Sequence, residues 1–114
     1  MDNRLNDALA FANYRLTLQV QRQNIEARVN SALLFSFQNA IFKSSQNLIA
    51  FVGFRTIRAE KLLLEDNSGN VIQIENPNEF LSALITAYDS AMELKQQEQQ
   101  RLKSARSTAK IVGL

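Results

Sequence analysis

The chemistry that this sequence could carry most directly is contact with phosphate, through a short run of basic residues. Arg101, Lys103, Arg106 and Lys110 follow one another with no acidic residue after Glu98. On a helix, positions 103, 106 and 110 share a face, and each cation could contact a nucleic-acid phosphate with salt-dependent affinity. The alternative is that these cations interact with the dipole at a helix C-terminus. No aromatic residue lies between them to stack on bases, which favours the alternative.

Catalysis has little support in the residue types present. The chain has no histidine and no cysteine, which removes the commonest general base and any thiolate nucleophile. Glycine-rich phosphate loops, serine nucleophile elbows and paired-carboxylate signatures are also missing from the sequence. Glu65, Asp66 and Asn67 could suggest a cation site, but they lack the ligand spacing of a calcium loop, and a solvated turn is the better interpretation. We therefore expect a protein that is not an enzyme and that uses no cofactor or metal.

Length and charge indicate one soluble domain without a strong electrostatic character. The 114 residues suit a single domain, and 13 basic against 11 acidic residues give a net charge of +2. The broad basic field that is typical of nucleic-acid binding is therefore lacking. The N-terminal residues do not resemble a signal peptide, and no stretch supplies the roughly 20 apolar residues of a spanning helix. We expect an intracellular protein without a membrane span.

The first half of the chain predicts a long helix. No glycine or proline occurs before Gly53, so we expect a helical arm over residues 1–52 that ends there. The phase of the apolar pattern shifts within Gln19–Arg28, which indicates a stutter or a break; continuity is favoured because no breaker residue is present. The apolar positions at helical spacing are Leu5, Leu9, Ala12 and Leu16, followed by Val29, Leu33, Phe37, Ile41, Leu48 and Val52. The polar Ser44 occupies the position of the second series between Ile41 and Leu48.

The second half predicts a hairpin followed by another helix. Two short apolar runs flank the loop that contains Gly69, which predicts a β-hairpin over residues 60–75. Asn76 can cap a helix, with Pro77 at its first position and Glu79 three residues after the cap. We therefore expect a second helical arm over residues 77–110. The fold class is thus mainly α, an elongated helical hairpin with one short β-hairpin.

Two resemblances follow from these features. The order of long helix, β-hairpin and long helix resembles prefoldin subunits, in which paired helices form coiled-coil tentacles around a hairpin-built hub; the broadly apolar Val29–Val52 departs from that pattern. Residues 5–18, 39–52 and 106–114, with eleven Asn and ten Gln, resemble small structural or assembly proteins of large tailed bacteriophages. This second resemblance implies a virion or assembly component, located in a virion or a host cytoplasm, that works through protein contacts.

The sequence is therefore interpreted as that of a structural or assembly protein, a homo-oligomer or part of a larger assembly, held by apolar helix packing. A nucleic-acid- or polymerase-associated accessory factor using the basic residues is the first alternative, and a prefoldin-like chaperone is the second. A membrane-surface role of residues 33–54 is a weaker third. The residues expected at the protein interface are Leu33, Phe37, Ile41, Leu48, Val52, Leu81, Leu84 and Tyr88.

Overall fold

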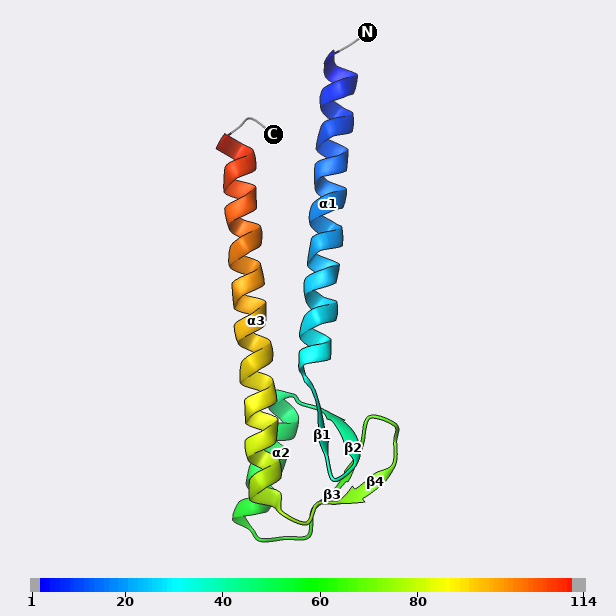
Figure 1. Cartoon of the computed structure of the whole chain (residues 1–114), viewed down its shortest axis with the longest axis vertical. Coiled ribbons are helices and arrows are strands. Elements are labelled where there is room, and N and C mark those ends of the chain that lie inside the picture. The colour runs from blue at the N-terminus through cyan, green and yellow to red at the C-terminus, as the bar shows by residue number, and fades with distance from the viewer. Residues whose placement is uncertain (1–2, 112–114) are drawn as a thin grey trace.

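The computed structural model describes the backbone of residues 3–111 and the side chains of residues 3–105. Three helices and two short hairpins follow one another along the chain (Figure 1). The elements are α1 (Asn3–Ala32), β1 (Leu34–Phe37), β2 (Ala40–Lys43), α2 (Gln46–Ile57), β3 (Leu63–Glu65), β4 (Val71–Gln73) and α3 (Pro77–Ile111).

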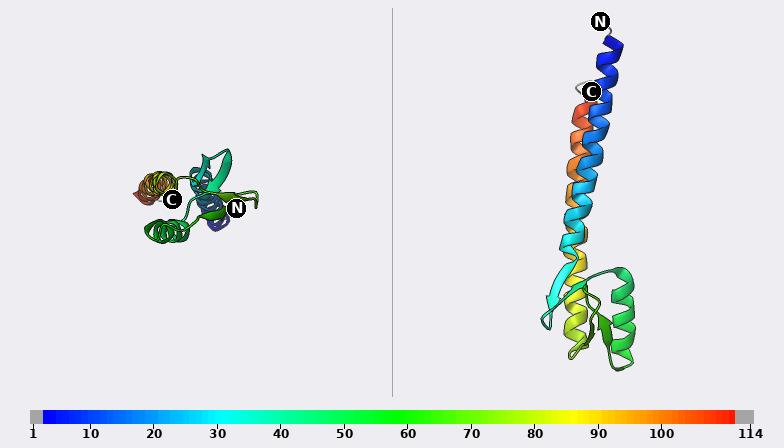
Figure 2. Two further views of the ribbon diagram at one scale, coloured as in Figure 1. Left: turned by 90° about the horizontal axis from the view of Figure 1, so that it is seen from below. Right: turned by 90° about the vertical axis from the view of Figure 1, so that its right-hand side faces the viewer.

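The molecule is a rod with a head at one end. Its extents are 71 × 25 × 19 Å and its radius of gyration is 21.0 Å, against about 13 Å for a compact domain of this length. The long helices α1 and α3 lie side by side, and α1 extends past the described end of α3 (Figure 1). Seen from the head end, α2 lies beside α3 and the hairpins gather on the other side, beneath α1 (Figure 2). The predicted mainly α, elongated helical hairpin is confirmed.

The prediction of one helical arm over residues 1–52 is wrong beyond Ala32. α1 runs unbroken through Gln19–Arg28, as favoured, but then β1 and β2 form an antiparallel hairpin in which Phe35 pairs with Phe42. The turn needs no glycine, because Gln38 and Asn39 adopt positive φ values of 51° and 62°, the conformation of a tight hairpin turn.

The burial pattern explains why this segment is a hairpin. Phe42 and Ala40 face inward on β2, while Ile41 and Lys43 face outward. This alternation has the period of a strand with one covered face. The apolar residues of the segment therefore bury one face of a sheet, where a helix would have spread them over several sides.

α2 is a separate helix that is not predicted from the sequence. Its cap is Ser45, whose Oγ accepts a hydrogen bond from the Leu48 amide at 3.1 Å. Gly53 does not end the helix but lies inside it, and the helix continues to Ile57. The left-handed turn that follows is made by Ala59, with a φ of 53°.

The second hairpin and the start of α3 agree with the sequence-based predictions. β3 pairs with β4, and Gly69 has a φ of 87° in the turn. The Asp66 carboxylate accepts hydrogen bonds from the amides of Ser68 and Asn70, both at 2.9 Å. The Asn76 side chain accepts one from the amide of Glu79 at 3.3 Å, as a helix cap does.

The two hairpins are joined to each other through Gln38. Its side-chain amide donates a hydrogen bond to the Gln73 carbonyl at 3.0 Å and accepts one from the Glu75 amide at 2.9 Å. The Asn67 amide also donates to the Ile41 carbonyl at 2.7 Å. Because a lone two-stranded hairpin is marginally stable in water, these cross-links and the packing beneath them hold the sheets in place.

The core of the head is centred on Phe80. This residue has no exposed surface, and its ring lies 5.0–5.6 Å from the rings of Phe35, Phe37 and Phe42. Ser44 is the one buried polar side chain among the described residues, and its hydroxyl donates to the Leu84 carbonyl at 2.7 Å. The remaining core residues are Ala40, Val52, Leu62, Leu64, Ile74 and Leu84.

We expect Phe80→Ala to lower the free energy of unfolding by about 3–5 kcal/mol, because it removes a fully buried ring and leaves a cavity. Chemical denaturation followed by circular dichroism measures this change. Ile57→Ala is the control, since Ile57 is 85% exposed and its loss should change stability by less than about 0.5 kcal/mol. Equal effects of the two substitutions would contradict this description of the core.

Candidate interaction surfaces

The two long helices are joined above the head by a small apolar cluster. Ile25 and Val29 of α1 pack against Ala91 of α3, which is fully buried. A small residue at this position lets the helix backbones approach closely, because no long side chain separates them. The partly buried residues that complete the cluster are Ala32, Leu33, Met92 and Leu102.

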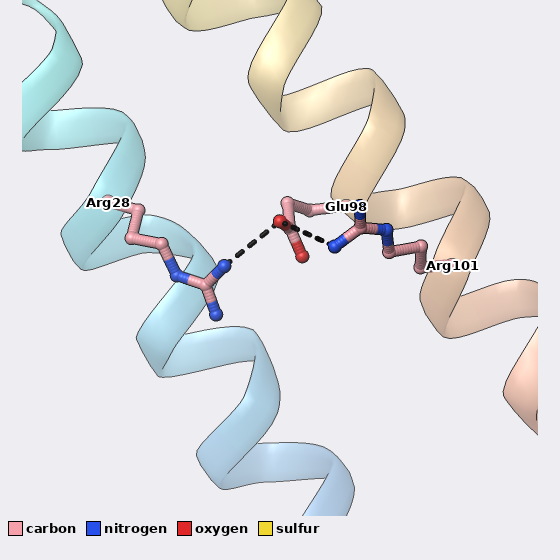
Figure 3. A network of polar contacts seen from close by, with 3 residues as sticks. All are labelled: Arg28, Glu98 and Arg101. Carbon is pink, nitrogen blue, oxygen red and sulfur yellow. Dashed lines mark hydrogen bonds and ion pairs between the residues drawn. The ribbon is translucent and has the colours of Figure 1, made fainter.

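Ion pairs extend this junction along the arms. Arg28 of α1 contacts the Glu98 carboxylate at 2.9 Å, and Arg101 approaches the same carboxylate at 3.5 Å (Figure 3). A second pair joins Lys95 of α3 to Glu26 of α1 at 3.5 Å. The side chain of Glu98 is only 13% exposed, so this carboxylate is the most shielded part of the network. The polar stretch around Glu98 therefore lies beside α1 and contributes charge to the junction.

The candidate phosphate-binding residues are only partly described. Arg101 shares Glu98 with Arg28, so its charge is already partly compensated. Lys103 is exposed and borders a hollow between the arms with Arg22, Ile25, Glu26 and Gln99. The side chains of Arg106 and Lys110 lie outside the described residues. The described part of the chain thus offers Lys103 as an exposed cation, in a hollow that the basic Arg22 and the acidic Glu26 also border.

The expected interface residues are divided between the interior and the surface. Val52 and Leu84 have no exposed surface and belong to the head core, so they are not available to a partner. Phe37, Leu48 and Leu81 are partly buried against the same core, and Leu33 packs in the junction between the arms. Tyr88 is half-buried, and its hydroxyl lies 2.6 Å from the Gln46 side-chain amide. Ile41 is 46% exposed on the outer side of the first hairpin and could contact a partner directly.

Exposed apolar side chains instead gather on the first two helices. We define the outer stripe as Leu5, Leu9, Ala12, Leu16 and Val20 of α1, in which the four large side chains are 45–59% exposed. The sequence predicts the helical spacing of all these residues except Val20. It does not predict that the outer stripe lies on the open side of α1, because periodicity alone does not say which face a neighbouring helix covers.

A second exposed group lies on α2, and we name it the α2 patch. Its members are Phe51, Phe54 and Ile57, which are 45%, 58% and 85% exposed. Arg55 lies over the Phe51 ring at 5.4 Å and Arg58 over the Phe54 ring at 5.5 Å. Both guanidinium groups also contact the Glu60 carboxylate. The arginines therefore cover part of the aromatic surface while their charge is shared with an acid.

Among the described residues, no group of three or more His, Cys, Asp or Glu side chains is placed to hold a metal ion. The acidic hairpin tip is a turn in which Asp66 accepts hydrogen bonds from backbone amides. Within residues 3–111, no helix combines the length and apolar character needed to cross a membrane.

Comparisons with models of known protein families, with curated proteins and with solved structures found no match for this chain.

We expect Arg28 and Glu98 to be energetically coupled by about 0.5–1 kcal/mol in a double-mutant cycle of alanine substitutions. The contact is charge-assisted and Glu98 is shielded, while Arg28 remains half-exposed, which limits the gain. Urea denaturation at low and high salt measures the coupling, which should fall as salt screens the pair. The Lys95 and Glu26 pair, longer at 3.5 Å, is the control with smaller coupling. A salt-independent coupling would show that packing, and not charge, joins the two residues.

Proposed function

We propose that this protein is a non-enzymatic structural subunit that associates with copies of itself, and through them with larger partners, by apolar helix packing. The setting proposed for it is a virion, or the assembly of one, of the tailed-bacteriophage kind that its sequence resembles. The burial of apolar helix surface between subunits would supply the driving force for association.

One observation carries this proposal. Large apolar side chains are exposed in groups, along the outer stripe and on the α2 patch. Single exposed apolar residues are normal on a protein surface, whereas grouped ones mark interaction sites. Here both groups lie on regular helices, which present their side chains at fixed spacing and suit helix-to-helix contact.

The elongated shape supports the same proposal. A rod 71 Å long has a large surface for its volume, so the chain buries less of itself than a compact domain does. Between Asn3 and Asn24, no residue of α1 is buried. A helix with apolar residues and so little cover is typical of one that gains its cover from another subunit.

The nucleic-acid alternative has weaker support. Of the basic residues expected to contact phosphate, Arg101 is engaged by Glu98, and Lys103 borders a hollow with residues of both signs, Arg22 and Glu26. Nucleic-acid binding through phosphate would also fall steeply with added salt, whereas association by apolar burial does not. Salt dependence therefore separates the two functions.

We expect the purified chain to form a defined oligomer that persists from low to high salt, because apolar contacts are not screened. Light scattering after size-exclusion chromatography at several protein concentrations measures its mass. Lys103→Ala should leave the mass unchanged and serves as the control. A chain that stays monomeric at all concentrations and both salt levels would refute self-association. Salt-sensitive DNA binding that is lost in Lys103→Ala would favour the accessory-factor alternative.

A further inference from the structure

We infer that the outer stripe of α1 is the surface on which a second copy of this chain docks, with the two α1 helices antiparallel about a two-fold axis. This inference rests on the proposed self-association and specifies its interface. It assigns the contact to one of the two exposed apolar groups and excludes the α2 patch as the primary site.

The outer stripe lies on the side of α1 that faces away from α3. Leu9, Leu16 and Val20 each have a counterpart nine residues later in Leu18, Ile25 and Val29. Nine residues are about two and a half helical turns, so each residue and its counterpart lie on opposite sides of the helix. Ile25 and Val29 are buried against α3, and Leu18 is partly buried. The members of the outer stripe are consequently turned outward.

The stripe has the spacing of a helix-pairing seam. Its members are separated by four, three, four and four residues, which keeps them on one side of the helix. Leu5 and Val20 lie about 22 Å apart along the axis at 1.5 Å per residue. The stripe therefore offers about four helical turns of contact to the helix of a partner.

The charge distribution favours a second copy as the occupant. In the fully described stretch from Leu5 to Val20, the charged residues are Asp7 and Arg15. By helical phase, both lie on the half of α1 that contains Leu18, and Arg15 lies over the Phe11 ring at 5.8 Å. A like surface therefore brings no like charges together, whereas a charged ligand would find no opposite charge on the stripe.

The residues that flank the stripe are also compatible with themselves. The polar residues closest to it in helical phase are the neutral Asn6, Asn13 and Gln19, and Gln23 continues the line of the stripe beyond Val20. An amide side chain both donates and accepts hydrogen bonds, so the same residues on two copies can pair across a two-fold axis. An interface in which one patch contacts its own copy requires this kind of self-complementarity.

The order of side chains favours the antiparallel direction. The stripe is nearly symmetric about Ala12. Leu5 and Leu9 precede this residue, and Val20 and Leu16 follow it at similar distances. In an antiparallel pair, Leu5 would meet Val20 and Leu9 would meet Leu16 of the second copy. The small Ala12 would lie at the crossing point and allow close approach. The two heads would then lie at opposite ends and would not collide, since each is joined to the end of α1 beyond Ala32.

We expect Leu9→Asp to weaken self-association at least about tenfold, because burial of an unpaired carboxylate opposes the contact. Light scattering across a concentration series measures the change. Ala10→Asp, which introduces the same charge about a quarter turn or more away from the stripe, is the matched control and should have little effect. Since Leu9 is 55% exposed and outside both core clusters, the helical circular dichroism signal should remain.

The outcomes separate this inference from the proposed function. If the Leu9→Asp variant still forms the oligomer while the Phe54→Asp variant of the α2 patch is monomeric, the proposed self-association is supported and the outer stripe is the wrong surface. If the unmodified chain is monomeric, the proposed self-association fails, and this inference fails with it.

Disulfide formation between introduced cysteines tests the direction of the pair, since the natural chain contains no cysteine. We expect Ala12→Cys to form a cross-linked dimer under mild oxidation, because the two copies of residue 12 meet near the two-fold axis. Leu5→Cys should cross-link poorly, since its copies would be separated by most of the stripe. Efficient cross-linking of Leu5→Cys would instead indicate parallel helices and overturn the antiparallel arrangement.

Discussion

The packing of the Phe80 ring is the contact on which the arrangement of the two arms depends. Phe80 lies in the first turn of α3, close to the cap residue Asn76, and its fully buried ring packs against the aromatic rings of the first hairpin. That hairpin continues from α1 with one residue between them. The ring therefore fixes the start of α3 relative to the end of α1. Two stiff helices that leave one head in this way are already placed side by side, and a small apolar cluster around Ala91 is enough to keep them so.

The parts of the fold that could be predicted from the sequence are those decided by local interactions. The cap at Asn76 and the turn at Gly69 are made by residues whose own conformation or side-chain hydrogen bonds specify them. The first hairpin could not be predicted in this way, because its turn is made by Gln38 and Asn39 without glycine. The apolar residues around that turn also fit both the period of a helix and that of a strand. Burial against Phe80, a residue far along the chain, decides between the two.

The candidate surfaces show a different limit of sequence patterns. An apolar residue at helical spacing indicates that something covers that position, but not whether the cover is the same chain or another one. Val52 and Ile41 both belong to the predicted interface, yet Val52 is enclosed by its own chain and Ile41 is open. The outer stripe is the reverse case, since its spacing is visible in the sequence but its accessibility depends on where α3 lies. Only the three-dimensional arrangement separates a core position from a surface available to a partner.

Few buried residues join the two arms, so the stability of α1 depends on its association with a second copy in the proposed assembly. The junction consists of a few apolar residues around Ile25 and of ion pairs in which at least one of the two side chains is exposed to solvent. Such ion pairs contribute little in water, and a helix within a protein owes most of its stability to the burial of one face. From Asn3 to Asn24, α1 has no buried residue of its own. A second copy on the outer stripe would supply that burial, and whatever binds the folded helix more tightly than the unfolded one stabilises it by mass action. In the proposed assembly, the helix that presents the interface is therefore also the element that gains most from forming it.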